Sequence, residues 1–262
     1  MKLTHLILSG AVCFNLLLSV TAQENYSLWP RRPAELEQAR QLFSQHKWEE
    51  AAYLLQPFIR NSGIIGAEAR NIVGRVNIAR YLSRMHPYSS VYVVKRGDTL
   101  PKIAHATECP VDLLMLYNGL VAPSNLKIGQ KLVFVNLSLR IEIYPGLKEI
   151  AVWDKDILVA SFKMISCSEV PAHSSNQKMV AVSARESYFS GKKVPGSNSQ
   201  AVAADKVIRL SDDTVISSTQ MGGSKSILLA PKDMNELALL VREGNSVLWV
   251  ENIAEQQPGV EN

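Results

Sequence analysis

The segment between residues 91 and 136 constrains the fold more than any other part of the chain. It begins with a β-branched and aromatic run, Val91–Val94, that predicts a short strand. Thr99 offers a hydroxyl that can accept a hydrogen bond from a free amide at a helix start, and Gly119 suits the end of a second helix. Lys131–Val135 predicts a closing strand. The order strand, helix, helix, strand therefore fits in about 45 residues, the low end of domain size.

Three motifs inside this segment occur in an order and spacing that resemble a LysM domain. They are YVVKRGDTLPKIA, DLLMLYNGL and NLKIGQKLVFV, and the resemblance spans residues 91–136. It implies binding to a glycan that contains N-acetylglucosamine, chiefly peptidoglycan or chitin. It also implies a groove between two turns, with these candidate glycan-binding residues: Gly97, Asp98, Thr99, Leu100, Leu126, Lys127, Ile128 and Gly129.

A glycan strand is an uncharged ribbon of hydroxyl and N-acetyl groups, so it calls for a shallow groove of backbone donors and acceptors. Gly97 and Gly129 would let the backbone come close to the sugar, because glycine has no Cβ. Each single side chain also has a structural alternative. Asp98 and Thr99 suit helix capping, and Leu100 suits the core.

Residues 139–252 show the alternation of apolar and polar positions that is typical of strands, for example over Leu139–Ile143. A helix is predicted to open at Pro231. Residues 183–205 predict loops, because they are rich in serine and contain glycine and proline. We therefore expect a β-rich domain with one main helix, and an α+β class for the multi-domain chain.

The segments VISST, GGSKSILLA and KDMNELALLVREGNSVLWV make residues 139–252 resemble the L,D-transpeptidase (YkuD-like) catalytic domain. In this resemblance the nucleophilic cysteine of the family falls at Ile227. The histidine before it falls at Lys225, and the arginine after it at Leu229. An upstream His-Gly pair falls at Ser217–Ser218. The resemblance thus implies the fold of that domain in a degenerate form.

The chemistry of that family needs a thiolate to attack an amide carbonyl, a histidine to activate it and cations to hold carboxylates. Isoleucine has no lone pair, and leucine cannot bind a carboxylate. Ser224 and Lys225 do not make a good Ser–Lys pair, because adjacent residues in a strand point to opposite faces. We expect no catalytic residue and no cofactor. The five histidines are scattered, so we expect no metal site either.

Residues 1–22 have the three parts of a secretory signal peptide. A basic start at Lys2 precedes an apolar run from Leu6 to Val20, and small residues follow before Gln23. The run is shorter than the roughly 20 apolar residues of a spanning helix, although an uncleaved anchor is the alternative. We expect an exported protein, periplasmic or associated with the cell wall, with no stable transmembrane span after signal removal.

Residues 30–86 predict a helical hairpin region, and residues 253–262 a tail. The phrase ARQLFSQHKWEEAAYLLQPFI resembles one tetratricopeptide unit. Stacked arrays usually need about three or more repeats, and only about one is visible. A helical spacer and a partner-binding unit therefore both stay open.

The formal charge of +4 does not imply nucleic acid, because dedicated binders cluster their basic residues on one face. Beyond the signal peptide, Cys109 and Cys167 are too few for a disulfide scaffold, and whether they pair stays open.

These features predict an exported peptidoglycan-binding protein that attaches to cell-wall glycan through its LysM-like segment. Its non-catalytic transpeptidase-like domain would dock stem peptides or an envelope protein partner. One alternative is an active wall-remodelling enzyme of the L,D-transpeptidase type. The other is an envelope scaffold that recruits partners through residues 30–86.

Overall fold

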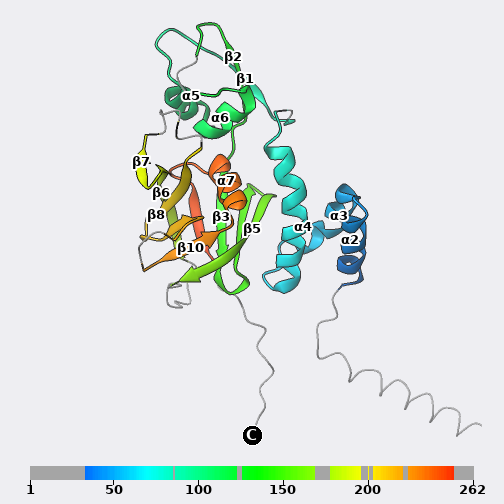
Figure 1. Ribbon diagram of the computed structural model, residues 1–262. Coiled ribbons are helices and arrows are strands. Elements are labelled where there is room, and N and C mark those ends of the chain that lie inside the picture. Colours follow the sequence, from blue (N-terminus) through cyan, green and yellow to red (C-terminus); the bar gives the residue numbers. More distant parts are fainter. Residues whose placement is uncertain are drawn as a thin grey trace, which may run out of the picture.

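The computed structural model describes residues 33–84, 86–122, 126–168, 178–195, 200, 203–220 and 224–250. The predicted signal peptide and the predicted C-terminal tail lie outside these residues. Figure 1 shows a group of helices, a small module of helices and strands, and a strand-rich body. The combination confirms the predicted α+β class.

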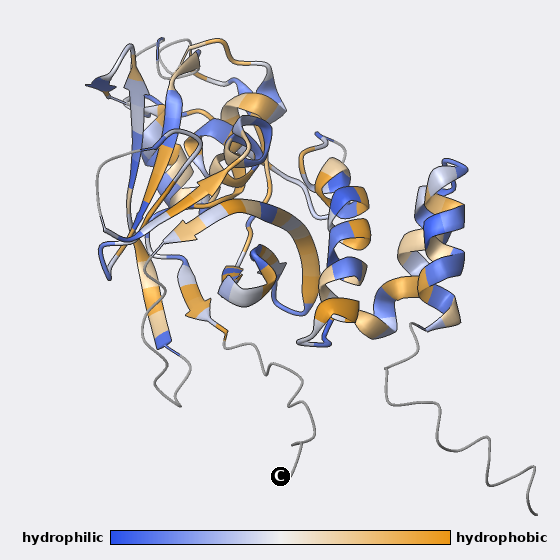
Figure 2. Ribbon diagram, turned by 60° about the horizontal axis from the view of Figure 1, so that its bottom comes forward, coloured by the Kyte–Doolittle hydropathy of each residue, from blue (hydrophilic) through white to orange (hydrophobic). Residues whose placement is uncertain are grey.

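The helical group comes first in the chain and packs beside the strand-rich body (Figure 1). It consists of α2 (Ala34–Ser44), α3 (Trp48–Leu55), the 3-10 turn η1 (Gln56–Phe58) and α4 (Ile64–Tyr81). Each helix carries both polar and apolar stretches, as Figure 2 shows, and buries its apolar residues against its neighbours. α4 is the helix that contacts the strands, mainly β5 (Ile157–Ser168).

The small module has the predicted order β1 (Ser90–Val93), α5 (Leu100–Thr107), α6 (Val111–Asn118) and β2 (Lys131–Phe134). The two strands are antiparallel, with Tyr92 opposite Leu132. The Thr99 hydroxyl accepts a hydrogen bond from the Lys102 amide at 3.4 Å and so caps α5. Gly119 adopts a φ of +61° and ends α6, as expected.

The strand-rich body is a barrel-like sheet. Its elements are β3 (Leu139–Tyr144), η2 (Pro145–Leu147), β4 (Glu149–Asp154), β5, β6 (Lys178–Phe189), β7 (Lys192–Val194), β8 (Asp205–Leu210), β9 (Val215–Ser217), β10 (Ser226–Leu229), α7 (Pro231–Leu240) and β11 (Ser246–Trp249). The strand order is β11-β3-β4-β5-β10-β9-β8-β6-β7. Because β11 also pairs with β6, the sheet closes on itself, and β7 extends it as a hairpin partner of β6. Closure removes most free strand edges.

The prediction that residues 183–205 are loop-rich is wrong for residues 183–189 and 192–194, and residues 196–199 and 201–202 lie outside the described part of the chain. β6 runs through Phe189, and β7 follows it. Polar residues of β6 make cross-strand contacts. Glu186 accepts hydrogen bonds from Lys193 Nζ at 2.6 Å and Arg209 Nε at 2.8 Å, and the Ser183 hydroxyl donates to the Arg209 carbonyl. Composition alone therefore cannot separate a polar strand from a loop here.

One apolar core runs without a break from the small module into the barrel. It contains Leu113 and Leu114 of α6 together with Ile141 and Val247 of the barrel strands. Ion pairs reinforce the contact: Asp112 with Arg185 at 2.6 Å is one of them. The module therefore packs against the barrel and shares its apolar core, instead of forming a separate domain core.

A second apolar core lies between the helical group and strands β4 and β5. It includes Leu55 and Val73 from the helices and Trp153 and Leu158 from the strands. Gly74 lets α4 approach β5 closely, because a Cβ there would lie 2.5 Å from the Ser161 amide nitrogen. The helical group is thus packed tightly onto the barrel.

Candidate functional site

Two glycine-containing turns of the small module lie side by side. The Val94 amide donates to the Gln130 carbonyl at 2.9 Å, and the Gly129 amide donates to the Val94 carbonyl at 2.8 Å. Gly97 and Gly129 have φ values of +84° and +82°, a left-handed conformation that favours glycine. No atom lies within 4 Å of a Cβ built at either glycine, so the backbone of both turns is open.

The side chains of the first turn have structural tasks. The Asp98 carboxylate accepts hydrogen bonds from the Lys95 amide at 2.7 Å and the Tyr92 hydroxyl at 3.0 Å. Thr99 caps α5, and Leu100 is fully buried in the core. These contacts agree with the structural alternatives for all three residues.

The second turn presents more of its side chains to solvent. Ile128 is 73% exposed, and Lys127 is exposed beside it. Leu126 is half-buried and packs against the core. The surface formed by the Gly97 turn and the Ile128–Gly129 turn is called the glycine-turn face below. Contact between this face and a glycan remains a prediction.

Asn118 is a residue whose role the sequence reasoning missed. Its Oδ1 accepts from the Val133 amide at 2.7 Å, and its Nδ2 donates to the carbonyls of Val133 and Leu114 at 2.8 Å each. The side chain thus ties the end of α6 to the edge of β2 and holds the second turn in place. The Tyr-Asn-Gly motif was the available signal.

Two of the positions that the sequence resemblance assigned to transpeptidase chemistry lie inside the barrel core, and Lys225 is half-buried. Ile227 and Leu229 are fully buried. Ile227 lies opposite Cys167 on β5 and Ile216 on β9. Lys225 donates from Nζ to the Asp212 carbonyl at 3.0 Å. Apolar packing therefore fills this position.

The upstream pair Ser217–Ser218 lies at the end of β9. Ser217 is buried, and its hydroxyl donates to the Thr219 carbonyl at 2.7 Å, a local turn contact. The hydrogen-bond partner of the Ser217 hydroxyl is thus a backbone carbonyl, which does not act as a general base.

Both described cysteines are free thiols. Burial raises the pKa of the Cys109 thiol to about 11, and burial also raises the pKa of Cys167. Each thiol is therefore protonated at neutral pH, unlike a nucleophilic cysteine. Within the described ranges, no group of histidine, cysteine and acidic side chains is arranged to hold a metal.

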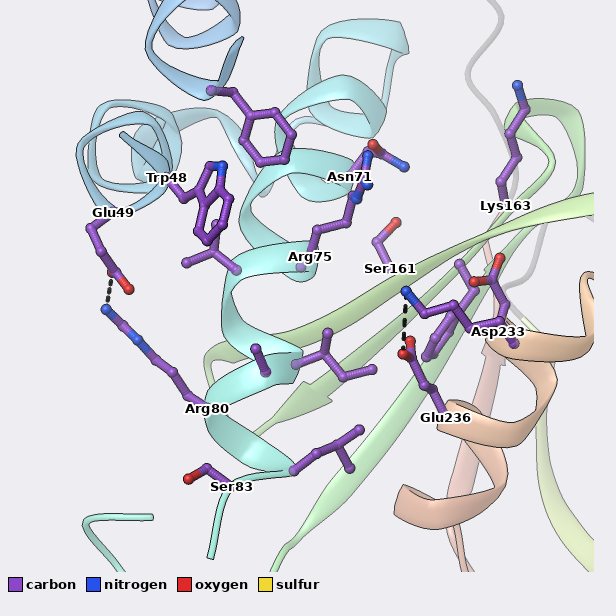
Figure 3. Close-up of a pocket in the computed structure, with 18 of the residues that line it drawn as sticks. Trp48, Glu49, Asn71, Arg75, Arg80, Ser83, Ser161, Lys163, Asp233 and Glu236 are labelled. Carbon is purple, nitrogen blue, oxygen red and sulfur yellow. Dashed lines mark hydrogen bonds and ion pairs between the residues drawn. The ribbon is translucent and has the colours of Figure 1, made fainter. Parts of the chain in front are cut away.

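A cavity of about 1080 Å³ lies between α4 and α7, over the outer side of β5 (Figure 3). It was not foreseen from the sequence, because its walls come from segments far apart in the chain. Trp48 and Arg75 belong to the helical group, Lys163 to β5 and Asp233 to α7.

Residues 92–134 match the family model described as LysM domain. The chain contains a LysM domain. The glycine-turn face lies within it and consists of the turn between β1 and α5 and the turn that precedes β2. LysM domains bind peptidoglycan and other glycans that contain N-acetylglucosamine, and they are typical of cell-wall-associated proteins. No curated protein matches the chain as a whole.

Solved structures of L,D-transpeptidases also match. An Enterococcus faecium L,D-transpeptidase is 14% identical with a TM-score of 0.29, over 45% of this chain and 53% of that one. A Mycobacterium tuberculosis L,D-transpeptidase 1 is 11% identical with a TM-score of 0.31, over 46% and 66%. A Stackebrandtia nassauensis L,D-transpeptidase is 10% identical with a TM-score of 0.33, over 83% and 90%. The aligned part spans about half the length of the Enterococcus chain.

None of the helices in the described ranges combines the length and the hydropathy that a membrane span requires.

Proposed function

We propose that this is an exported peptidoglycan-binding protein whose LysM domain holds it on wall glycan through the glycine-turn face. Its barrel is non-catalytic and docks a wall stem peptide or an envelope protein. The observation that carries the proposal is a contrast within one molecule. The two glycine turns are open to solvent, whereas Ile227, at the position of the nucleophile, is fully buried.

The open turns suit an uncharged sugar ribbon. Their left-handed glycines leave open space where a Cβ would lie, and Ile128 adds an exposed aliphatic side chain for an acetyl methyl group. An apolar side chain that is already exposed gains from such a contact, because the contact removes hydrocarbon from water.

The non-catalytic part of the proposal rests on residue chemistry and on burial. The barrel offers hydrocarbon at Ile227 and Leu229, and the Cys167 thiol nearby is protonated at neutral pH. Acyl transfer through a thiolate needs an ionised, accessible sulfur.

The proposed domain limits are 1–22 for the signal peptide, 30–86 for the helical region, 91–136 for the LysM domain, 139–252 for the degenerate transpeptidase-like domain and 253–262 for the tail. Removal of the signal peptide would release the remaining chain to the periplasm or the cell wall.

Glycan binding is tested by co-sedimentation of the signal-free chain with purified sacculi and by titration with chitotetraose. Deleting residues 91–136 is a poor test, because this segment shares the barrel core. Ile128→Asp is sharper, because it places a charge against an uncharged ligand. We expect affinity to fall about tenfold or more, which corresponds to about 1.4 kcal/mol.

Met179→Asp is the matched control, since Met179 is 69% exposed on the barrel. It should leave binding unchanged. Equal binding by wild type and Ile128→Asp would overturn the proposed glycan site.

Catalysis is tested separately by incubating the pure chain with muropeptides and analysing the products by mass spectrometry. We expect no new cross-link and no cleaved bond. A new product, or an acyl adduct on the chain, would instead support the active wall-remodelling enzyme.

A further inference from the structure

The cavity between α4 and α7 is separate from both sites described above. Its walls come from α2, α3, α4, β5 and α7 and from the segment that follows α4, and neither β10 nor the LysM domain contributes to it. Its volume of about 1080 Å³ is slightly above the roughly 300–1,000 Å³ typical of small-ligand sites. We call it the α4–α7 cleft.

The cleft has a substantial apolar surface. Val76, Leu82 and Phe162 line it, and half-exposed Trp48 lies on its α3 side. Figure 3 shows Trp48 and Arg75 on the helical side of the cleft and Asp233 and Glu236 on the α7 side. Val76 and Phe162 are buried in its floor, so a ligand with hydrocarbon segments would bury mainly the exposed parts of Trp48 and Leu82.

Some of the charged residues in the cleft are already paired. Glu49 pairs with Arg80, and Glu236 pairs with Lys232 at 3.7 Å, the two contacts dashed in Figure 3. The charges of these four residues are therefore largely neutralised within the protein.

Three other charged residues in the cleft are not paired in this way. Within the described part of the chain, neither Arg75 nor Lys163 has a carboxylate within ion-pair distance. Arg75 lies over the Phe43 ring at 5.4 Å. Asp233 makes no ion pair with any described residue, and burial raises its pKa despite the opposing effects of Lys232 and Arg75. Two cations and one carboxylate are thus available to a ligand.

We propose that the α4–α7 cleft binds a short peptide that carries both a carboxylate and an amine. The peptide carboxylate lies against Arg75 and Lys163, the amine lies against Asp233, and aliphatic side chains cover Trp48 and Leu82. A simple anion would pair only with the two cations and would leave the apolar surface exposed to solvent. A peptide of both charges satisfies all three groups, and charge-assisted hydrogen bonds are the stronger kind.

This inference deepens the proposed function, on which it rests for the source of the peptide, the stem peptide of the wall. It places peptide docking at a cleft on the outside of the barrel, and leaves the buried β10 strand with a packing role.

The test uses isothermal titration of the signal-free chain with the tetrapeptide Ala-Glu-Lys-Ala with free termini. The comparison peptide is Ala-Gln-Gln-Ala with both ends capped, which has similar size and no charge. We expect the charged peptide alone to bind measurably. Arg75→Gln with Lys163→Gln should weaken binding about tenfold or more, and Asp233→Asn should also weaken it.

Lys155→Gln with Lys192→Gln is the matched control, because it removes two exposed lysines outside the cleft. It should leave peptide binding unchanged. Arg75 and Lys163 are themselves exposed, so their replacement should leave the circular dichroism spectrum unaltered.

Two readouts separate this inference from the proposed function. Peptide binding should persist in Ile128→Asp, and chitotetraose binding should persist in Arg75→Gln with Lys163→Gln. Glycan binding without any peptide binding would overturn the cleft and leave the LysM role intact. Peptide binding without glycan binding would overturn the proposed LysM role and leave the peptide site in the cleft intact. Equal peptide binding by the cleft variant and its control would also overturn the cleft.

Discussion

Arg70 of α4 and Glu149 of β4 form a two-point ion pair inside the protein. Arg70 Nε lies 2.9 Å from Glu149 Oε1, and Nη2 lies 2.6 Å from Oε2. The two side chains are 0% and 6% exposed. The remaining Arg70 nitrogen donates to the carbonyls of Ile59 and Asn61 at 3.0 and 2.7 Å. The pair therefore joins the helical group to the barrel at a fully hydrogen-bonded point.

Replacing Arg70 by methionine should destabilise the protein by about 3–5 kcal/mol, because it leaves the Glu149 carboxylate buried without its partner. Urea unfolding monitored by circular dichroism measures this loss. Lys47→Met, which removes an exposed ion pair with Glu50, should cost about 1 kcal/mol or less. Similar losses for the two variants would contradict the importance of the buried pair.

Gly74→Ala should destabilise the protein, although alanine normally favours a helix over glycine by about 1 kcal/mol. The added Cβ would lie 2.5 Å from the Ser161 nitrogen and 2.9 Å from the Ala160 carbonyl carbon, both backbone atoms that cannot move aside easily. The expected loss is about 1–3 kcal/mol.

The melting temperatures of Gly74→Ala and of Asn71→Ala, a variant on the same helix, are compared with that of the wild type. Asn71 is half-buried and borders the α4–α7 cleft, so its replacement should leave the melting temperature nearly unchanged. A higher melting temperature for Gly74→Ala would show that α4 does not press against β5.

Glu186 should make stability depend on pH in the acidic range. Hydrogen bonds from Lys193, Arg209 and Tyr188 lower its pKa from 4.5 to about 2 in the folded protein, with the Lys193 bond as the largest cause. Because the folded pKa is the lower one, this stabilisation is present above the unfolded value and is lost as pH falls from about 4.5 towards 2.

Urea midpoints of wild type and Glu186→Gln, measured between about pH 7 and pH 3, should therefore converge as the pH falls. A constant difference between the two urea midpoints across that range would contradict the lowered pKa of Glu186.

Local features of this protein were set by neighbouring residues, and the sequence predicted them. Thr99 caps α5 and Gly119 ends α6, because caps and left-handed turns depend on residues a few positions away. The LysM order is likewise readable from the chain alone.

Only the tertiary structure decided which distant segments meet. Arg70 and Glu149 are 79 positions apart, and the α4–α7 cleft joins residues from Phe43 to Glu236. The serine, glycine and proline content of residues 183–205 predicts loops, whereas the cross-strand partners of Glu186, Lys193 on β7 and Arg209 on β8, stabilise a strand there. Such contacts depend on how the barrel closes and how α4 packs on it, and no local pattern of residues encodes either.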